Sequence, residues 1–315
     1  MGQWKRGEVG GIMSAVSFCV LPQRGVFAIA GTDRRSFLQG LVSNDVNKVS
    51  ANGVIHAALL TSQGKFLHDF FVAEAAERLL LDAEAVRLED LRTRLGRFRL
   101  RAAVTLTVEN DWIVAVAFGP GTAAALGLAM KTVHHLAGGG VSYVDPRLPA
   151  IGVRLMGMPS DVMETLHEAG CNETAQIAYE RLRLELGLPD GSRDIVVERA
   201  GLLECGFEEL NGVDFGKGCY VGQEVTTRSK YRGLIKKRLV PVMVEGPVPV
   251  PGTPLLLDGR EAGEMRSATE GIGLALIRLE ALAQAQHASR PFHAGTTRLF
   301  PRLPGWMVLP LRPGD

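Results

Sequence analysis

Residues 213–224 combine the side chains in this sequence that are best suited to chemistry. They read Val-Asp-Phe-Gly-Lys-Gly-Cys-Tyr-Val-Gly-Gln-Glu, so that Gly218 and Gly222 bracket Cys219, and Lys217 stands two positions before it. The glycines allow the backbone to turn tightly and to approach a ligand. The nearby lysine and the N-terminus of a helix expected over 221–231 both favour a thiolate. This pattern predicts a reactive thiol, with a small cysteine packed in a tight turn as the alternative.

Polar side chains after Cys219 extend this candidate site. Gln223 can offer both a donor and an acceptor to the edge of an amide-like ring. Glu224 either takes part in the site or pairs with Lys217 or Arg228. A basic run follows, made of Arg228, Lys230, Arg232, Lys236, Lys237 and Arg238. The simpler interpretation is a solvated surface. The alternative is a binding surface for an acidic tail, an RNA or a protein.

The cysteines and histidines as a whole give no metal-binding pattern. The four cysteines are Cys19, Cys171, Cys205 and Cys219. No two of them have C-x-x-C spacing, and none stands near a histidine in a zinc-type spacing. Reduced thiols fit this chain length better than a disulfide framework. The pair His134-His135 is better explained as a solvated loop than as a metal site. Nucleotide-binding, zinc-protease and serine-hydrolase motifs are absent.

Short strands and helices are expected to position these residues. A strand at 26–30 leads into a helix at 34–41, which Thr32 or Asp33 can cap, and then into a polar turn at 42–46. The rhythm of strands and helices that follows favours an α+β layer over a doubly wound sheet. The further strands are expected at 54–61, 65–72, 79–81, 104–108, 112–118 and 151–155, with 104–108 and 112–118 as a pair, and the further helices at 83–98, 161–169 and 175–187. In the last eighty residues, frequent prolines and glycines between strands predict a small all-β barrel.

Length and composition exclude several classes of protein. A chain of 315 residues suits two or three units that share an interface. A net charge of +1 does not indicate a globally basic nucleic-acid binder. The sequence contains no run of eighteen apolar residues, so we expect no membrane-spanning helix. The apolar stretch at 16–21 is too short for a secretory signal, and the N-terminus lacks the arginines and serines of a mitochondrial presequence. We expect a cytoplasmic protein that starts at Met1 or Met13.

The string K-G-C-Y-x-G-Q-E over residues 217–224 resembles the signature of the YgfZ family, bacterial relatives of the glycine-cleavage T-protein. Other segments resemble elements of this family in the same order, namely 31–40 its first helix, 60–66 its hairpin, 181–189 its central helix and 271–277 a barrel strand. The resemblance covers about residues 22 to 280. It implies an α+β, T-protein-like fold: a ring of two ferredoxin-like α+β units and a C-terminal β-barrel around a central folate cavity.

The resemblance also implies a division of the chain and a function. Residues 1–21 would be a poorly ordered extension, 22–145 the first α+β, folate-binding unit, 146–232 the second unit with the motif, and 233–315 the barrel. The implied function is that of a tetrahydrofolate-binding accessory protein of the bacterial cytoplasm, which assembles or repairs iron–sulfur clusters in client enzymes, including tRNA-modifying ones. The partners would be folate, assembly proteins and clients, without a membrane and without direct nucleic-acid binding.

Site residues follow from the resemblance position by position. Cys219 and Lys217 would carry the chemistry, with Lys217 holding an anionic folate tail or keeping the thiolate charged. One thiol cannot supply the four ligands that a cluster usually takes, so no resident metal is expected and any contact of Cys219 with a cluster is transient. Asn44 and Asp45 resemble the polar turn of the family, and Asp45 either faces the cavity or caps that turn.

The remaining folate contacts centre on an aromatic ring. Tyr179 falls where the family presents such a ring to folate, and packing in the core is the alternative. A second aromatic contact of the family maps near Arg24, which could instead stack or bind a carboxylate. The other residues expected to bind folate are Tyr220, Gln223, Glu224 and Arg228.

One difference from the T-protein concerns its chemistry. The T-protein carries paired aspartates after its hairpin, one of which aminomethyl transfer requires, and His68 and Asp69 stand there in this chain. We therefore expect the cavity without that aminomethyltransferase activity. Two alternatives remain: a folate-dependent one-carbon transferase with another substrate, and a non-catalytic interaction module whose pocket has decayed.

Overall fold

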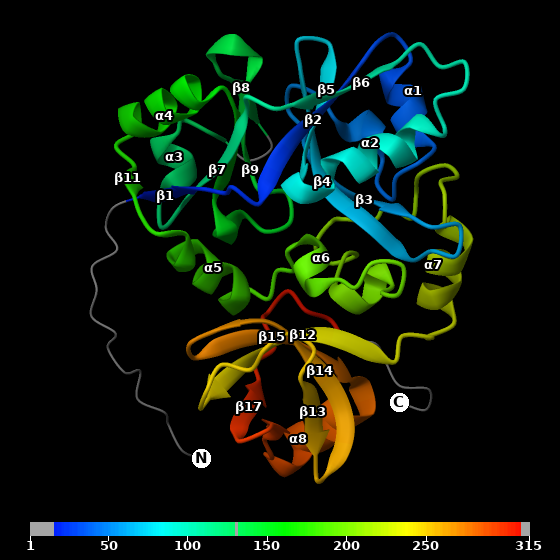
Figure 1. The fold of residues 1–315 in the computed structure, drawn as a ribbon, viewed down its shortest axis with the longest axis vertical. Coiled ribbons are helices and arrows are strands. Elements are labelled where there is room, and N and C mark those ends of the chain that lie inside the picture. The colour runs from blue at the N-terminus through cyan, green and yellow to red at the C-terminus, as the bar shows by residue number, and fades with distance from the viewer. Residues whose placement is uncertain (1–15, 130–131, 310–315) are drawn as a thin grey trace.

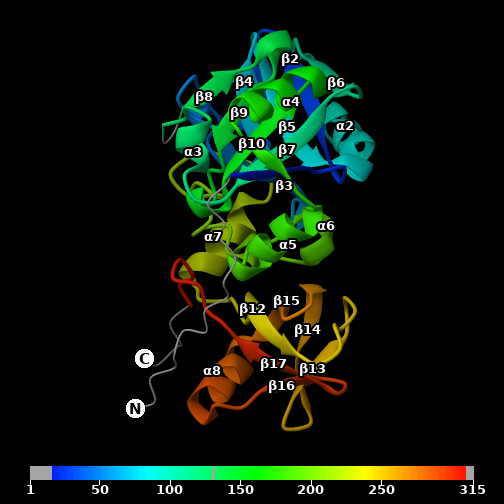
Figure 2. The same cartoon turned by 90° about the vertical axis from the view of Figure 1, so that its left-hand side faces the viewer.

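The computed structural model describes residues 16–129 and 132–309, and its strands form three sheets (Figure 1). Two sheets lie side by side at the top of the view, and a closed barrel lies at the bottom. A layer of helices separates the barrel from the two sheets, as the turned view also shows (Figure 2). This layer contains α5 (Gln176–Glu185) and α6 (Gly191–Asp194). Side chains from both sheets and from the helical layer can therefore meet near the centre of the molecule.

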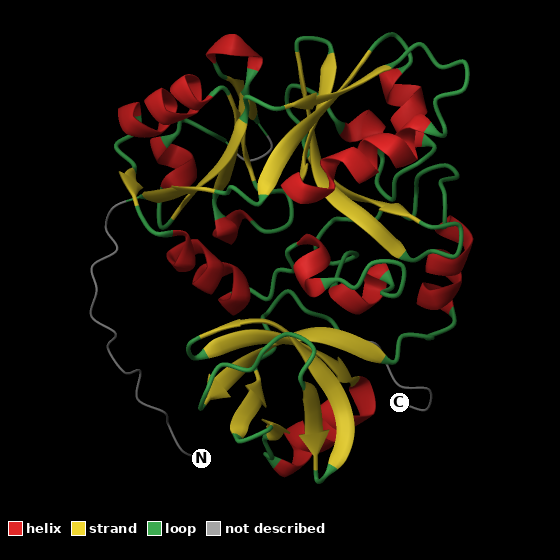
Figure 3. Cartoon of the chain, in the orientation of Figure 1, coloured by secondary structure: helices red, strands yellow, loops and turns green. Residues whose placement is uncertain are grey.

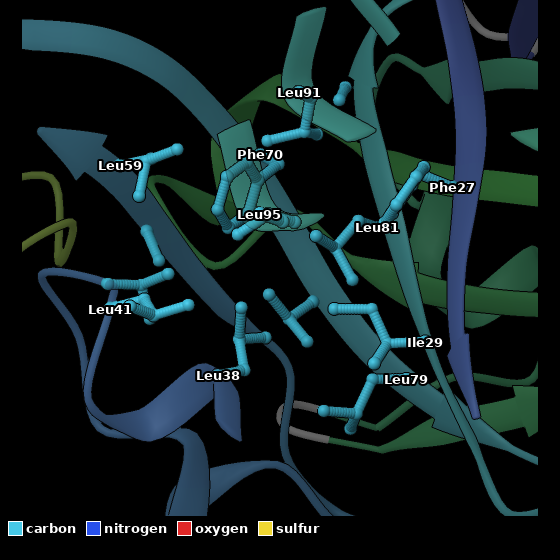
Figure 4. Close-up of a cluster of buried hydrophobic side chains, with 14 of the residues drawn as sticks. Phe27, Ile29, Leu38, Leu41, Leu59, Phe70, Leu79, Leu81, Leu91 and Leu95 are labelled. Carbon is cyan, nitrogen blue, oxygen red and sulfur yellow. The ribbon is translucent and has the colours of Figure 1, made fainter. Parts of the chain in front are cut away.

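The first sheet has five antiparallel strands in the order β3-β4-β5-β2-β6. Phe27 and Ile29 of β2 are two residues apart, so they point to the same face, where they join Leu91 and Leu95 of α2 in one core (Figure 4). Fully burying such a side chain stabilises the fold by roughly 1.5–3 kcal/mol. The elements of this unit are β2 (Arg24–Ala30), α1 (Arg34–Gln39), β3 (Ile55–Leu60), β4 (Phe66–Ala75), β5 (Arg78–Glu84), α2 (Leu88–Gly96) and β6 (Thr105–Glu109).

The second sheet has six strands in the order β11-β1-β7-β10-β9-β8, and only β1 and β11 pair in parallel. Helix α4 begins with Pro159, a residue suited to the first helical position, and buries Val162 and Leu166 against this sheet. The elements are β1 (Ser17–Val20), β7 (Ile113–Phe118), α3 (Thr122–Ala125), β8 (Val133–His135), β9 (Val141–Val144), β10 (Val153–Gly157), α4 (Pro159–Glu168) and β11 (Asn172–Glu173).

The barrel closes in the order β12-β15-β14-β13-β16-β17 and carries helix α8 at its side (Figure 3). Alternate residues of its strands, such as Val240 and Val242 of β12, point inward and form its core. Helix α7 (Gln223–Tyr231) precedes the barrel. The barrel elements are β12 (Lys237–Glu245), β13 (Pro254–Leu257), β14 (Arg260–Thr269), β15 (Ile272–Arg278), α8 (Leu279–Ala288), β16 (Phe292–Ala294) and β17 (Thr297–Pro301).

This architecture confirms the predicted α+β class and the C-terminal barrel, but the sheets divide the chain differently from the expected units. Strands β7, β8 and β9 fall within 22–145, yet they lie in the second sheet together with β10. The expected pairing of 104–108 with 112–118 is wrong, because β6 pairs with β2 whereas β7 pairs with β1 and β10. The turn between β6 and β7 therefore carries the chain from one sheet to the other.

Smaller differences concern single elements. The helix expected at 83–98 begins only at Leu88, because 78–84 completes β5. Of the extension expected at 1–21, residues 17–20 form β1, which pairs with β7 and β11, and residues 1–15 lie outside the described residues. None of the helices described in 16–129 and 132–309 combines the length and apolar character that a membrane crossing requires.

Candidate functional site

The loop before α7 lies against the turn that follows α1. The backbone N–H of Asp214 donates to the carbonyl oxygen of Ser43 at 2.9 Å, and its Oδ2 lies 2.6 Å from Nζ of Lys48. The other carboxylate oxygen of Asp214 accepts from the N–H of Gly216 at 2.7 Å. Two segments about 170 residues apart in sequence are thus joined, in agreement with the separation of 175 positions between Val42 and Lys217.

Lys217 is the strongest link between these two segments. Its Nζ donates to three carbonyl oxygens, those of Gln39 at 2.7 Å, Val42 at 2.6 Å and Asn44 at 2.9 Å. Burial lowers the pKa of Lys217 to about 8, and the three carbonyl oxygens favour its charged form at neutral pH. The expected role of this lysine needs correction, because an ammonium group that uses all three hydrogens on the backbone holds no anionic tail. Lys217 anchors the loop instead.

A second fixed point is the contact of Gly222 with the β3–β4 hairpin. Gly222 has φ +83°, and a Cβ built on it would lie 2.5 Å from the carbonyl oxygen of Thr61 and 3.0 Å from Cα of Gly64. Gly64 itself has φ +71°. Only glycine combines this backbone conformation with such a close approach, so the predicted tight turn is present at Gly222. Its close partner, however, is the hairpin backbone.

Cys219 is exposed between these two anchors. This exposure removes the alternative of a small cysteine packed in a buried turn. Helix α7 begins at Gln223, close to the predicted start. The other three cysteines are buried, and burial raises the pKa of Cys19 to about 11 and raises that of Cys171 and Cys205 as well. In the described ranges, Cys219 is therefore the thiol that another molecule can reach.

The remaining motif residues serve the helix and the core. Tyr220 is buried in an apolar cluster that includes Leu60 and Phe66. Glu224 and Arg228 form an exposed ion pair one helical turn apart, with Oε1 and Nη2 separated by 3.0 Å. This is one of the two pairings considered for Glu224, and such a surface pair contributes at most about 1 kcal/mol. Gln223 is the first residue of α7. Their predicted contacts with folate stay predictions.

Asn44 and Asp45 hold the turn that Lys217 binds. The Nδ2 of Asn44 donates to the carbonyl oxygens of His56 at 2.8 Å and Asn211 at 2.7 Å. The Oδ1 of Asp45 accepts from the N–H of Asn47 at 3.0 Å and thereby caps the 3-10 turn Val46–Lys48. Asp45 serves its own turn, as expected if it caps that turn, whereas Asn44 also ties the turn to Asn211, 167 positions further along the chain.

The basic run on and after α7 divides into buried and exposed residues. Arg238 is buried and donates to the carbonyl oxygen of Leu203 at 2.8 Å and to Glu209, and Lys230 pairs with Glu208. Among the described residues, no carboxylate forms an ion pair with the remaining three, Arg232, Lys236 and Lys237. The exposed part of the run lies on and just after α7.

Tyr179 and Arg24 belong to a second location, the centre between the two upper sheets. They line a cavity together with Asp69, Phe71 and Arg154. Tyr179 is buried, which raises its pKa, and its hydroxyl accepts from Nη1 of Arg154 at 3.3 Å. The free volume of this cavity is about 10 Å³. The sequence-predicted folate residues are therefore divided between this centre and the Cys219 loop.

His68 and Asp69 point away from each other because neighbouring residues of a strand alternate in direction. Nε2 of His68 lies 2.9 Å from Oδ2 of Asp90 on α2, and burial, with Arg87, lowers the pKa of His68 to about 4. Oδ2 of Asp69 lies 3.1 Å from Nε2 of His56. Burial works against the charged form of Asp69, but the bond with His56 and the nearby arginines lower its pKa to about 2. The two side chains cannot act as a pair.

Two charged residues at the centre of the molecule were not singled out from the sequence: Arg154, which lines the cavity, and its partner Asp82. Asp82 and Arg154 are fully buried charges inside apolar strands, and Oδ2 of Asp82 lies 2.6 Å from Nη2 of Arg154. A charged residue at the end of Leu79-Leu-Leu-Asp82 was the signal that could have revealed them, since buried charges require a partner. No group of three or more His, Cys, Asp or Glu side chains in the described part of the chain is placed to hold a metal ion.

The comparisons with known proteins agree with this geometry. The family described as "CAF17, C-terminal beta-barrel domain" matches residues 236–309. The mitochondrial iron–sulfur cluster assembly factor IBA57 of Mus musculus is 30% identical over 291 residues, which cover 85% of this chain and 79% of that protein. The mitochondrial IBA57 homologue of Pyricularia oryzae is 29% identical over 300 residues, which cover 87% of this chain and 75% of that protein.

A solved structure gives the same fold. The glycine cleavage system aminomethyltransferase T from Bartonella henselae matches with a TM-score of 0.73 and 15% identity, over 93% of this chain and 86% of that one. The predicted T-protein-like fold is confirmed. The predicted bacterial cytoplasmic location is contradicted, because these sequence relatives are mitochondrial proteins.

Proposed function

The chain belongs to the CAF17/IBA57 family of iron–sulfur cluster assembly factors, and we propose that it contacts the cluster through the exposed thiol of Cys219. The observation that carries this proposal is the contrast between Cys219 and the other three cysteines, which are buried. A thiol must be reachable and able to ionise to bind iron, and burial opposes both. The cluster is the cargo of this chain, and Cys219 is its point of contact.

A single thiol shares a cluster with another molecule. Clusters usually take four protein ligands, and the described residues offer one exposed cysteine and no group of metal ligands. The remaining ligands must come from an assembly protein or a client enzyme. We therefore propose a transient cluster held between Cys219 and a partner, which suits transfer better than storage.

The two anchors of the loop keep this thiol in one place. Lys217 ties the backbone before Cys219 to three carbonyl oxygens, and Gly222 packs the backbone after it against the hairpin at Thr61. A ligand held on a rigid support loses less conformational entropy when it binds than a ligand on a free loop. Lys217 is thus a positioning residue for Cys219.

The surface at the C-terminal end of α7, the end away from Cys219, suits a protein with acidic groups. On and after α7, Tyr231 and Leu234 are 72% and 51% exposed. The charges of Arg232 and Lys236 have no ion-pair partner within the described ranges. Aromatic and arginine side chains are enriched where proteins bind each other, and an unpaired positive charge speeds association with a negative surface.

A complementation experiment tests this proposal. In a deletion strain, we expect wild type and Glu224→Gln to restore the activity of an iron–sulfur enzyme, and Cys219→Ala to fail although the protein accumulates normally. Glu224 is the matched control because it is an exposed neighbour on the same segment. If Cys219→Ala restored the enzyme activity, the thiol would not be needed for this function.

Tetrahydrofolate and tRNA-modifying clients stay predictions from the sequence resemblance. The side chains around the central cavity do not fit a pteridine as they stand, because about 10 Å³ is roughly the room that one water needs. A one-carbon transferase also lacks support, since Asp69 is engaged with His56 and His68 faces α2.

A further inference from the structure

Three arginines gather on one aromatic ring at the centre of the molecule. The guanidinium carbons of Arg24, Arg147 and Arg154 lie 5.8, 4.8 and 4.3 Å from the ring centroid of Phe71. None of the three is more than 6% exposed. Guanidinium groups at these distances from an aromatic ring are attracted to it, and more strongly where water is excluded. We call Arg24, Arg147, Arg154 and Phe71 the arginine stack.

Buried carboxylates hold the arginine stack in place. Oδ1 of Asp82 accepts from Nε of Arg24 at 2.7 Å, and Oδ2 of Asp82 accepts from Nε of Arg154 at 2.7 Å. Oδ2 of Asp145 accepts from Nη2 of Arg147 at 2.8 Å. Each guanidinium is therefore already paired. The charges of the stack serve the protein itself and are not free for an anionic ligand.

The arginine stack joins the two upper sheets. Arg24 and Asp82 come from β2 and β5 of the five-stranded sheet, whereas Arg154 comes from β10 of the six-stranded sheet. The pair Asp82–Arg154 thus crosses from one sheet to the other. Moving Arg154 away would leave the buried Asp82 with Arg24 as its one remaining arginine, which is unfavourable for a buried charge.

The space that the stack leaves is small. Sites for small molecules typically measure roughly 300–1,000 Å³, whereas this cavity leaves about 10 Å³. Asp69 lines this cavity, and its buried Oδ1 has no hydrogen-bond partner. A single water donating to this oxygen fits both the volume and the unpaired acceptor.

We infer that the arginine stack fills the central cavity with the side chains of the chain itself, fastens the two sheets, and excludes reduced folates from this place. This inference is independent of Cys219. Failure of the stack to exclude folate would leave the thiol's role intact, and the reverse also holds.

Calorimetry with tetrahydrofolate tests this inference on the full chain. We expect no saturable heat for wild type. Tyr179→Phe, which keeps the aromatic ring, is the matched control and should likewise give only the heat of dilution. Heat that saturates with wild type and persists in Tyr179→Ala would come from a site away from the cavity and would agree with the inference. Saturable heat that Tyr179→Ala abolishes would overturn it, since Tyr179 lines the cavity.

A second titration asks whether the stack itself causes the exclusion. Arg24→Ala/Arg154→Ala removes two guanidiniums from the ring of Phe71 and enlarges the cavity. Gain of saturable binding by this double variant alone would support the inference directly. If the double variant does not fold, that failure agrees with the fastening role, and the wild-type titration still decides on exclusion.

Discussion

Nζ of Lys217 lies 2.6 Å from the carbonyl oxygen of Val42, although 175 positions separate the two residues in the chain. Together with the bonds to Gln39 and Asn44, this contact fixes the loop that presents Cys219. The lysine of the motif therefore acts on the backbone rather than on a ligand. The position of the thiol depends on a joint between two distant segments.

Lys217→Met should weaken this joint. The variant leaves two buried carbonyl oxygens and one partly buried carbonyl oxygen without their donor, and we expect a loss of about 2–4 kcal/mol in the free energy of unfolding. Urea denaturation of Lys217→Met and of Arg228→Met measures the difference. Arg228 is the control because its ion pair is exposed. Equal stability of the two variants would show that the carbonyl contacts contribute little.

Gly222→Ala and Gly218→Ala form a matched pair of loop variants. A Cβ at Gly222 meets the carbonyl oxygen of Thr61 at 2.5 Å at φ +83°, whereas a Cβ at Gly218 meets nothing within 4 Å. The positive φ alone costs roughly 1–2 kcal/mol for a residue with a side chain. We expect Gly222→Ala to lower Tm by several degrees and Gly218→Ala to leave it nearly unchanged. Thermal unfolding with the opposite order would contradict the close packing of this turn.

Stability should fall as the pH drops from 6.5 toward 4 because of His68. Burial lowers its folded pKa to about 4, so the unfolded chain binds more protons over this interval, and the contribution is fully present only above pH 6.5. Between pH 7 and pH 5 this amounts to a loss of up to about 2 kcal/mol. Denaturation of wild type and His68→Asn at both pH values measures it. A pH dependence that is unchanged in His68→Asn would assign the effect to other groups.

Arg154→Met should be among the more destabilising single substitutions in the chain. It leaves Asp82 buried beside one arginine instead of two, so we expect a loss below the about 3–5 kcal/mol that removing the last partner of a buried charge costs. The exposed pair Arg228–Glu224 is again the comparison, at about 1 kcal/mol or less. If Arg154→Met unfolds at the same denaturant concentration as wild type, the stack does not fasten the two sheets.

Local signals in the sequence predicted the loop well. Glycines around Cys219 and the change of pattern at α7 are short-range features, and the tight turn at Gly222 and the exposed thiol follow from them. The hydrogen-bond partners of Lys217 could not be predicted from the sequence, because every residue has a backbone carbonyl oxygen. Their choice depends on how the turn after α1 meets the loop in three dimensions.

The arginine stack could not be predicted from the sequence for a related reason. Arg24 was expected to contact a ligand, but its partner Asp82 lies 58 positions away and the second partner of that carboxylate, Arg154, lies 72 positions further on. Such pairings follow from the order of strands in two sheets. The expected boundary near residue 145 missed that order, since β7 to β9 join the second sheet.

The exposed surface at the C-terminal end of α7, with Tyr231 and Leu234, should tolerate substitution without loss of the fold. Tyr231 and Leu234 are exposed, so we expect Tyr231→Ala and Leu234→Ser to keep the Tm of wild type and yet to reduce complementation in the deletion strain. Val250→Ser, an exposed apolar residue of the barrel, is the control. Full complementation by both α7 variants would place the partner elsewhere.

Cluster uptake by purified protein tests the role of Cys219 most directly. A [2Fe–2S] cluster held by glutathione supplies the further thiolates, and visible circular dichroism reports its transfer into the asymmetric surroundings of a protein. We expect wild type and Gly218→Ala to give the same new spectrum and Cys219→Ser to give none. The same spectrum from Cys219→Ser would contradict cluster binding through this thiol.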